Sequence, residues 1–220
     1  MSAARVVLWR HGRTPSNAEG RFQGQLDVDL DDVGRAQAAE AAAVLAELAP
    51  TRLVSSDLLR AAHTAGALAE RTGLEVETDP RLRELHAGAW QGLLHADIRA
   101  GWPELFAAWR DGEDVAVGGG ERRSEVGRRV VAAVRAAAAS TPGGGPLVVV
   151  SHGGAVRAGV LELLGLPAGS WPRLGGLGNC RWAVLEERAA GWSLAGYDLG
   201  AVPHPRARRS SSDAAADATV

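Results

Sequence analysis

Two histidines in this sequence stand directly after runs of apolar residues. Residues 6–9 lead into Arg10 and His11, and residues 147–150 lead through a serine into His152. Unbroken apolar runs of this length are typical of strands that are buried on both faces of a parallel sheet. Because open α/β sheets bind ligands beyond the carboxyl ends of their strands, both histidines are expected at one edge of one sheet. A single histidine at a strand end is usually structural, but this pair, with an arginine beside it, indicates a shared site for an anion.

Phosphoryl transfer is the chemistry that these residue types suit. It requires the phosphoryl oxygens to be neutralised and a nucleophile to lie in line. A neutral imidazole can attack phosphorus when its other ring nitrogen donates to a carbonyl, which fixes the tautomer. Neighbouring arginines should lower the pKa of His11 from its ordinary value of about 6.5, whereas a phosphate dianion facing His152 should favour the imidazolium form. Gly153 and Gly154 open a predicted helix, whose free amides can also bind a phosphate oxygen.

The composition excludes several classes of function. The 220 residues carry a formal net charge of −2, so there is no general attraction to nucleic acid or to anionic membranes. Every one of the 24 residues counted as lysine or arginine is arginine, which excludes Schiff-base, pyridoxal phosphate and P-loop lysine chemistry. A single cysteine, Cys180, excludes an intrachain disulfide and a multi-cysteine metal site. We expect a small-molecule phosphate ester as the partner and neither a cofactor nor a metal ion.

The alternation of strand and helix patterns predicts a single three-layer α/β/α domain with a mostly parallel sheet, covering residues 1–202. The predicted helices cover residues 32–48, 58–72, 103–110, 154–164 and a stretch around Val126, Val130 and Val134. Further strands are predicted at 52–57 and weakly at 74–76, and 182–185 with 192–197 form a candidate hairpin. Residues 13–29 and 81–92 are expected to be loops, the second with short helical pieces. Residues 203–220 lack large apolar side chains and are expected to be a disordered tail.

No secretory signal and no apolar run long enough to span a bilayer is recognisable, so a cytoplasmic location is expected. The oligomeric state stays open, with a homodimer as the candidate assembly.

The residues around both histidines resemble the histidine phosphatase (phosphoglycerate-mutase-like) superfamily. Its RHG signature is matched at residues 8–14. The other matches follow in the family's order: Asn17, then residues 22–27, 55–65, 83–92, 119–121 and 151–154. An RHG tripeptide by itself is a weak signal, but the ordered set is specific. The resemblance implies the phosphoglycerate-mutase-like fold and a metal-independent reaction.

The resemblance also implies a role for each matched position. His11 corresponds to the nucleophile that becomes phosphohistidine, and Glu84 to the acid that protonates the leaving alkoxide and later activates water. The other phosphate ligands are Arg10, Arg60 and His152, and the loop residues that contact the phosphoryl group or substrate are Asn17, Gln23 and Gly24. Taken without the resemblance, Arg60 and Glu84 would be read as ordinary solvated residues.

Two other phosphatase chemistries are disfavoured by the residues. The acidic run from Asp27 to Asp32 could suggest a metal site or an aspartate nucleophile. No apolar strand precedes it and no catalytic lysine exists, so a solvated loop with a helix cap is the better interpretation. Cys180 lacks the arginine six positions later that cysteine phosphatases use.

Within the superfamily, the sequence favours the phosphatase branch over the mutases. The resemblance implies that mutases follow the catalytic glutamate with a basic residue, whereas Leu85 follows Glu84 here. We expect a phosphorylated three-carbon acid bearing a sugar as substrate, with its carboxylate held by Arg123 or its neighbour Arg122. Trp90, Trp102 and Trp109 are either faces for the sugar ring or members of the core. A phosphoglycerate mutase, a broad-specificity phosphatase and a non-catalytic phospholigand-binding relative remain the alternatives.

Overall fold

Six strands form one sheet in the computed structural model, which describes residue 3 and residues 5–201. The strand order across the sheet is β3-β2-β4-β1-β5-β6. The first four strands pair in parallel, and β5 and β6 are antiparallel, so the sheet is mostly parallel as predicted. The strands are β1 (Arg5–Arg10), β2 (Arg52–Ser55), β3 (Val76–Thr78), β4 (Leu147–Ser151), β5 (Trp182–Arg188) and β6 (Gly191–Leu199).

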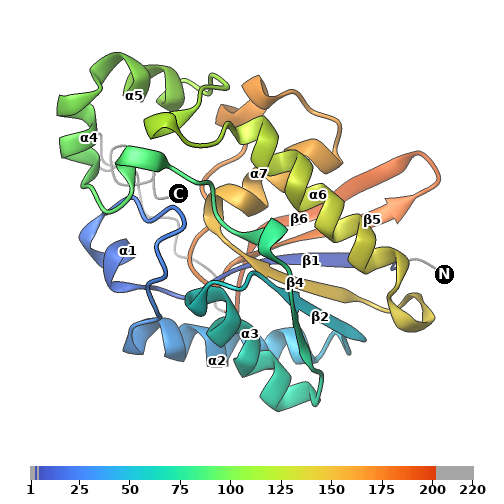
Figure 1. Ribbon diagram of the computed structural model, residues 1–220. Coiled ribbons are helices and arrows are strands. Elements are labelled where there is room, and N and C mark those ends of the chain that lie inside the picture. The colour runs from blue at the N-terminus through green and yellow to red at the C-terminus, as the bar shows by residue number, and fades with distance from the viewer. Residues whose placement is uncertain (1–2, 4, 202–220) are drawn as a thin grey trace.

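Helices cover both faces of this sheet (Figure 1). In β1, Val7 and Trp9 belong to one apolar cluster with residues of α2 (Asp32–Ala46) and α3 (Leu59–Thr72). Val6 and Leu8 alternate with them and belong to the other cluster, with residues of α6 (Arg123–Ala139) and α7 (Gly153–Leu163). Successive side chains of a strand point to opposite faces, so an unbroken apolar strand requires cover on both. The predicted three-layer α/β/α architecture is confirmed.

Local signals fix the ends of several helices. Asp31 caps α2, because its Oδ1 accepts a hydrogen bond from Gly34 N over 2.7 Å. Gly73 ends α3 in the left-handed conformation, with φ +71°. The hairpin predicted from residues 182–185 and 192–197 is confirmed as β5 and β6.

Several elements differ from the prediction. The loop 13–29 contains a short helix, α1 (Pro15–Glu19), which Thr14 caps. Strand β3 begins at Val76 and not at residue 74. The helix predicted at residues 103–110 is confirmed as α5 (Pro103–Arg110), but a helix that was not predicted, α4 (His95–Gly101), precedes it, with a break at Trp102. A residue before proline is pushed out of the helical region, which explains this break.

Two of the three tryptophans considered as faces for a sugar ring lie in the core. Trp90 is completely buried and Trp109 is 3% exposed, and both pack with Phe22 and Phe106. Trp102 alone of the three is exposed, at 37%. Trp90 and Trp109 therefore pack mainly as core residues and do not offer open faces to a sugar ring.

Within the described residues, no helix combines the length and the apolar character needed to cross a membrane. The predicted disordered tail, residues 203–220, lies outside the described residues.

Candidate active site

The pairing of β1 with β4 brings the two histidines together. Arg10 is the register partner of Ser151, and His11 N donates to Ser151 O over 3.0 Å. The next residue after each strand is a histidine, and the ring centroids of His11 and His152 lie 5.1 Å apart. Both rings are buried at the carboxyl ends of the parallel strands, where the sequence predicted them.

The ring of His11 is held in one tautomer. Its Nδ1 lies 2.7 Å from Gly12 O, and because a carbonyl oxygen can only accept, Nδ1 carries the proton. The other ring nitrogen, Nε2, therefore keeps its lone pair. Burial, together with the charges of Arg60 and Arg10, lowers the pKa of His11 well below its ordinary value. The ring is thus neutral at neutral pH and can act as a nucleophile.

Three buried donors close to His11 have no hydrogen-bond acceptor in the described part of the chain. They are Nε and Nη2 of Arg10 and Nδ2 of Asn17. The remaining Arg10 nitrogen, Nη1, donates to Leu177 O, and burial lowers the pKa of Arg10. Buried donors in proteins nearly always find acceptors, so this group suits a ligand that offers several oxygens, such as a phosphoryl group.

Arg60 is fully buried, and its donors reach both His152 and the loop between α1 and α2. Its Nη1 and Nη2 donate to Leu26 O over 2.7 Å and to Gly24 O over 2.8 Å, while Nε donates to His152 Nδ1 over 3.2 Å. Burial is the main cause that lowers the pKa of Arg60 to about 10. Gly24 therefore takes part through its backbone carbonyl, in a left-handed conformation with φ +55° that favours glycine.

His152 is neutral in this arrangement. Its Nδ1 accepts from Arg60, so the ring proton is on Nε2, which donates to Ser56 Oγ over 2.9 Å. Burial, followed by the charge of Arg60, lowers the pKa of His152 well below its ordinary value. From the sequence, the imidazolium form is expected when a phosphate dianion faces the ring. In the protein alone, desolvation and the neighbouring guanidinium favour the neutral form.

The carboxylate of Glu84 is held by two backbone amides. Leu85 N donates to Oε1 over 2.8 Å, and Gly154 N donates to Oε2 over 2.9 Å. Gly153 and Gly154 form the first turn of α7, where amide groups have no partner within the helix. Glu84 is 3% exposed, so the helix terminus fixes a buried carboxylate that the sequence alone would have placed on the surface.

The loop after β1 forms a network around Asn17. Asn17 Oδ1 accepts from Thr14 N, from Thr14 Oγ1 and from Asn179 Nδ2, at 3.1–3.2 Å. Thr14 Oγ1 also lies 3.0 Å from Gln23 Oε1, and Gln23 is buried. Asn179 Nδ2 further donates to His11 O over 3.2 Å. The predicted loop residues Asn17 and Gln23 are therefore tied to the histidine segment.

The two candidate arginines after the glycine break face different surroundings. Arg122 is exposed and donates to Asp114 O. Arg123 is buried, with its guanidinium carbon 4.1 Å from the ring centroid of Trp171 and 5.0 Å from that of Trp109. Burial is the main cause that lowers the pKa of Arg123 to about 9. Among the described residues, its Nε and Nη1 have no acceptor.

Arg123 lines a small cavity of about 10 Å³. Its lining includes Leu85 and Gly154, the two residues whose amides hold the Glu84 carboxylate. Arg123, and not Arg122, therefore lines a cavity next to the residues that hold the Glu84 carboxylate.

Two groups near the site were missed as functional residues from the sequence. Ser56 follows β2, the parallel neighbour of β4, and contacts His152. If the predicted strand had stopped at residue 55, Ser56 would have been selected as a residue that directly follows a strand end. Arg129, on α6, donates to Glu84 O, and no local pattern in the sequence indicates this contact.

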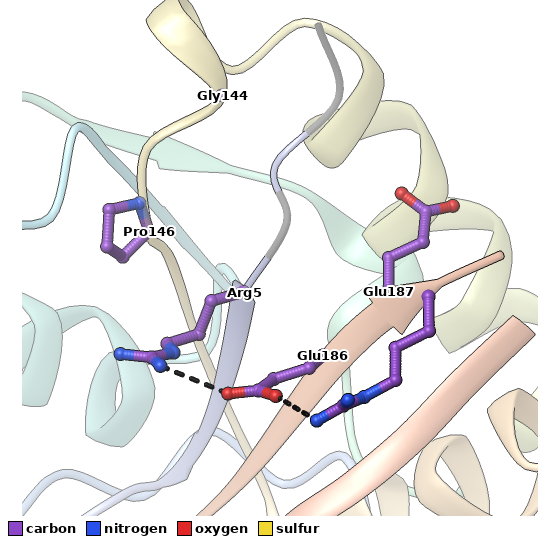
Figure 2. Close-up of a pocket in the computed structure, with 6 residues that line it drawn as sticks. Arg5, Gly144, Pro146, Glu186 and Glu187 are labelled. Atoms are coloured by element: carbon purple, nitrogen blue, oxygen red, sulfur yellow. Dashed lines mark hydrogen bonds and ion pairs between the residues drawn. The ribbon is translucent and has the colours of Figure 1, made fainter.

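A separate hollow of about 370 Å³ lies at the start of β1, beside Arg5 (Figure 2). It is bordered by the ion pairs of Glu186 with Arg5 at 3.0 Å and with Arg188 at 2.7 Å. Arg5 and Arg10 are the two ends of β1, so this hollow is at the opposite edge of the sheet from the histidines. Exposed ion pairs of this kind are ordinary surface features, and we assign no site to them.

Comparison with known families identifies relatives over nearly the whole chain. The model of the histidine phosphatase superfamily (branch 1) matches residues 6–199. A glucosyl-3-phosphoglycerate phosphatase from Mycolicibacterium vanbaalenii is 45% identical over 207 residues, covering 91% of this chain and 90% of the relative. A protein from Serratia proteamaculans, described as a probable phosphoglycerate mutase, is 36% identical, with 87% and 89% of the two chains covered.

A solved structure is similar to this chain over almost the same length. The mycobacterial glucosyl-3-phosphoglycerate phosphatase in complex with VO3 superimposes with a TM-score of 0.85 and 46% sequence identity. The match covers 90% of this chain and 100% of that chain.

Proposed function

The chain belongs to the histidine phosphatase superfamily, and on this premise we propose that it hydrolyses glucosyl-3-phosphoglycerate through a phosphohistidine formed on His11. The observation that carries the proposal is the state of the His11 ring. Its Nδ1 donates to Gly12 O, its pKa is lowered by burial and by two arginines, and the unprotonated Nε2 is left for attack.

In the first step, Nε2 of His11 attacks phosphorus and the bond between phosphorus and the ester oxygen breaks. Glu84, which enters this step with its carboxyl group protonated, donates that proton to the departing alkoxide, which is otherwise a poor leaving group. The unpaired donors of Arg10 and Asn17 hold phosphoryl oxygens. Arg60 joins them, and so does His152 once the phosphate dianion has converted its ring to the imidazolium form.

In the second step, a water molecule attacks the phosphohistidine. The carboxylate of Glu84 accepts the proton of that water, the bond between nitrogen and phosphorus breaks, and inorganic phosphate leaves. His11 returns to its neutral form and Glu84 to its protonated form. The guanidinium groups supply the positive charge that this reaction needs, so the proposal includes no metal ion.

The buried guanidinium of Arg123 favours a substrate whose leaving group carries a carboxylate. A buried guanidinium with two unpaired nitrogens is matched by a carboxylate, and Arg123 lies beside the residues that hold Glu84. The cavity there has room for about one water molecule, so binding requires a side chain such as Trp171 to shift. The absence of lysine and the presence of Leu85 after Glu84 favour hydrolysis over a mutase reaction.

A substrate panel tests the proposal. Phosphate release should have the highest kcat/KM for glucosyl-3-phosphoglycerate, compared with 3-phosphoglycerate and p-nitrophenyl phosphate. Arg123→Gln should lower the preference for the carboxylated substrates about tenfold or more, and the exposed Arg122→Gln is the matched control.

Each contrary result points to a named alternative. Similar efficiency on all substrates would indicate a broad-specificity phosphatase. Conversion of 3-phosphoglycerate to its 2-phospho isomer would indicate a mutase. Absence of phosphate release from every ester would indicate a phospholigand-binding relative.

A further inference from the structure

The segment that carries Glu84 has little regular structure of its own. It lies between two short 3₁₀ turns, Pro80–Leu82 and Gly88–Trp90. A segment outside helices and sheets lacks the repeated backbone hydrogen bonds that fix those elements. Its position must therefore come from groups elsewhere in the chain.

One side chain of α6 holds this segment at three carbonyl groups. Arg129 donates through Nη1 to Arg81 O over 2.8 Å and to Arg83 O over 2.5 Å. Through Nη2 it donates to Glu84 O over 2.8 Å. The forked geometry of a guanidinium allows one side chain to hold several acceptors at once, which an ammonium group does not reproduce.

The guanidinium of Arg129 is in turn fixed by Glu121. Nε and Nη2 donate to the two oxygens of the Glu121 carboxylate, both over 2.8 Å. Burial by itself would raise the pKa of Glu121, but the hydrogen bonds from Arg129 and from His86 N lower it, so Glu121 is ionised. The pair is bidentate and partly buried, which makes it stronger than an open surface ion pair.

The loop of Glu121 also packs directly on the segment after Glu84. Glu121 N donates to His86 O over 2.8 Å. A Cβ atom on Gly120 would lie only 1.8 Å from His86 O, so this approach requires glycine. The two loops are therefore joined by the backbone as well as by the Arg129–Glu121 pair.

We infer that Arg129, fixed by Glu121, is the positioning residue that sets the carboxylate of Glu84 for proton transfer to the leaving group. Arg129 reaches the backbone of Glu84 and not its carboxylate, so it acts through Glu84. The inference rests on the proposed role of Glu84 as the general acid. Small displacements of a catalytic group lower rates steeply, by about 10²-fold for 1 Å.

A charge-conserving variant tests this role. Arg129→Lys keeps the positive charge but removes the forked guanidinium group. Keeping the charge matters because the charge of Arg129 also lowers the pKa of His152, after the larger effects of burial, Arg60 and His11. Gln25 Nε2 still donates to Glu84 O over 3.0 Å, so we expect a partial displacement. Arg128→Lys, an exposed neighbour on the same helix, is the matched control.

The readout is kcat/KM for two leaving groups, because this parameter reports only the steps up to the first loss of product. Arg129→Lys should lower kcat/KM on the order of tenfold for an alkyl phosphate such as 3-phosphoglycerate. For p-nitrophenyl phosphate, whose leaving group needs no proton, the change should stay within about twofold. In a Glu84→Gln background, Arg129→Lys should cause no further loss on the alkyl ester.

Two results would overturn the inference. One is an equal loss on both substrates, and the other is a full additional loss in the Glu84→Gln background, since either would mean that Arg129 acts on stability or on another group. Thermal unfolding is measured in parallel. Should Arg129→Lys fail to fold, Glu121→Gln, which keeps the side-chain shape, must show the same leaving-group dependence. If Glu84→Gln lowers kcat/KM equally for both leaving groups, the proposed role of Glu84 as the general acid is refuted instead.

Discussion

Arg10 on β1 is paired in register with Ser151 on β4, and this pairing places His11 beside His152. The two residues are far apart in the chain, yet their strands are parallel neighbours that end at the same level. Shifting the register by one residue would turn every side chain of β1 to the other face, so the apolar packing of both layers also protects the geometry of the site.

The first prediction concerns the phosphoenzyme. His11 should become phosphorylated during turnover, because its Nε2 is unprotonated while Nδ1 is held by Gly12 O. Quenching at high pH should trap a phosphoenzyme that is stable in alkali and labile in acid. His11→Asn should lower kcat on the order of 10⁴-fold or more and abolish the label. Near-normal turnover in this variant would exclude the mechanism.

The second prediction concerns Glu84 as the proton donor. Glu84→Gln should lower kcat/KM for sugar or glycerate phosphates by about 10²- to 10⁴-fold, because an alkoxide needs a proton to leave. The loss on p-nitrophenyl phosphate should be much smaller. Steady-state kinetics on both esters measures this difference, and equal losses would remove the general-acid assignment.

The third prediction links the buried histidines to stability. Because the pKa values of His11 and His152 are lowered in the folded state, the unfolded chain binds protons below about pH 6.5 that the folded chain does not. The free energy of unfolding should therefore be intact above about pH 6.5 and fall as the pH drops below it, by up to about 1.4 kcal/mol per histidine per pH unit.

Urea unfolding at pH 7.5 and 5.5 measures this effect. His152→Gln should lose about 1 kcal/mol less stability than the unmodified protein over that interval. The exposed His86→Gln, a histidine variant outside the buried pair, is measured alongside at the same two pH values. An unchanged pH dependence in His152→Gln would contradict the assignment of a neutral, buried His152.

The fourth prediction is that phosphatase activity is independent of divalent metal ions. Arg10 and Arg60 are buried guanidinium groups that already supply positive charge beside His11. Incubation with EDTA followed by removal of the chelator should leave kcat within about twofold of its starting value. Activity that EDTA abolishes and magnesium restores would reject the prediction.

Local signals in the sequence are sufficient to predict several elements of the fold. Apolar runs predicted β1 and β4, since strands covered on both faces need continuous apolar residues. Asp31 and Gly73 marked helix ends because capping is decided by nearest neighbours. The positions of Arg10, His11 and His152 at one sheet edge followed from parallel strand direction. Arg60 and Glu84 were found only through their resemblance to a family.

The partners that these residues contact depend on the packing of the whole fold. The contact of Arg60 with Gly24 O and that of Arg129 with Glu84 O join segments more than 30 residues apart. No local pattern encodes such contacts, because they depend on how helices pack against the sheet. The same packing buried Trp90 and separated Arg123 from Arg122. Side-chain type is written in the sequence, but burial and hydrogen-bond geometry, which set pKa values and tautomers, exist only once distant segments are in contact.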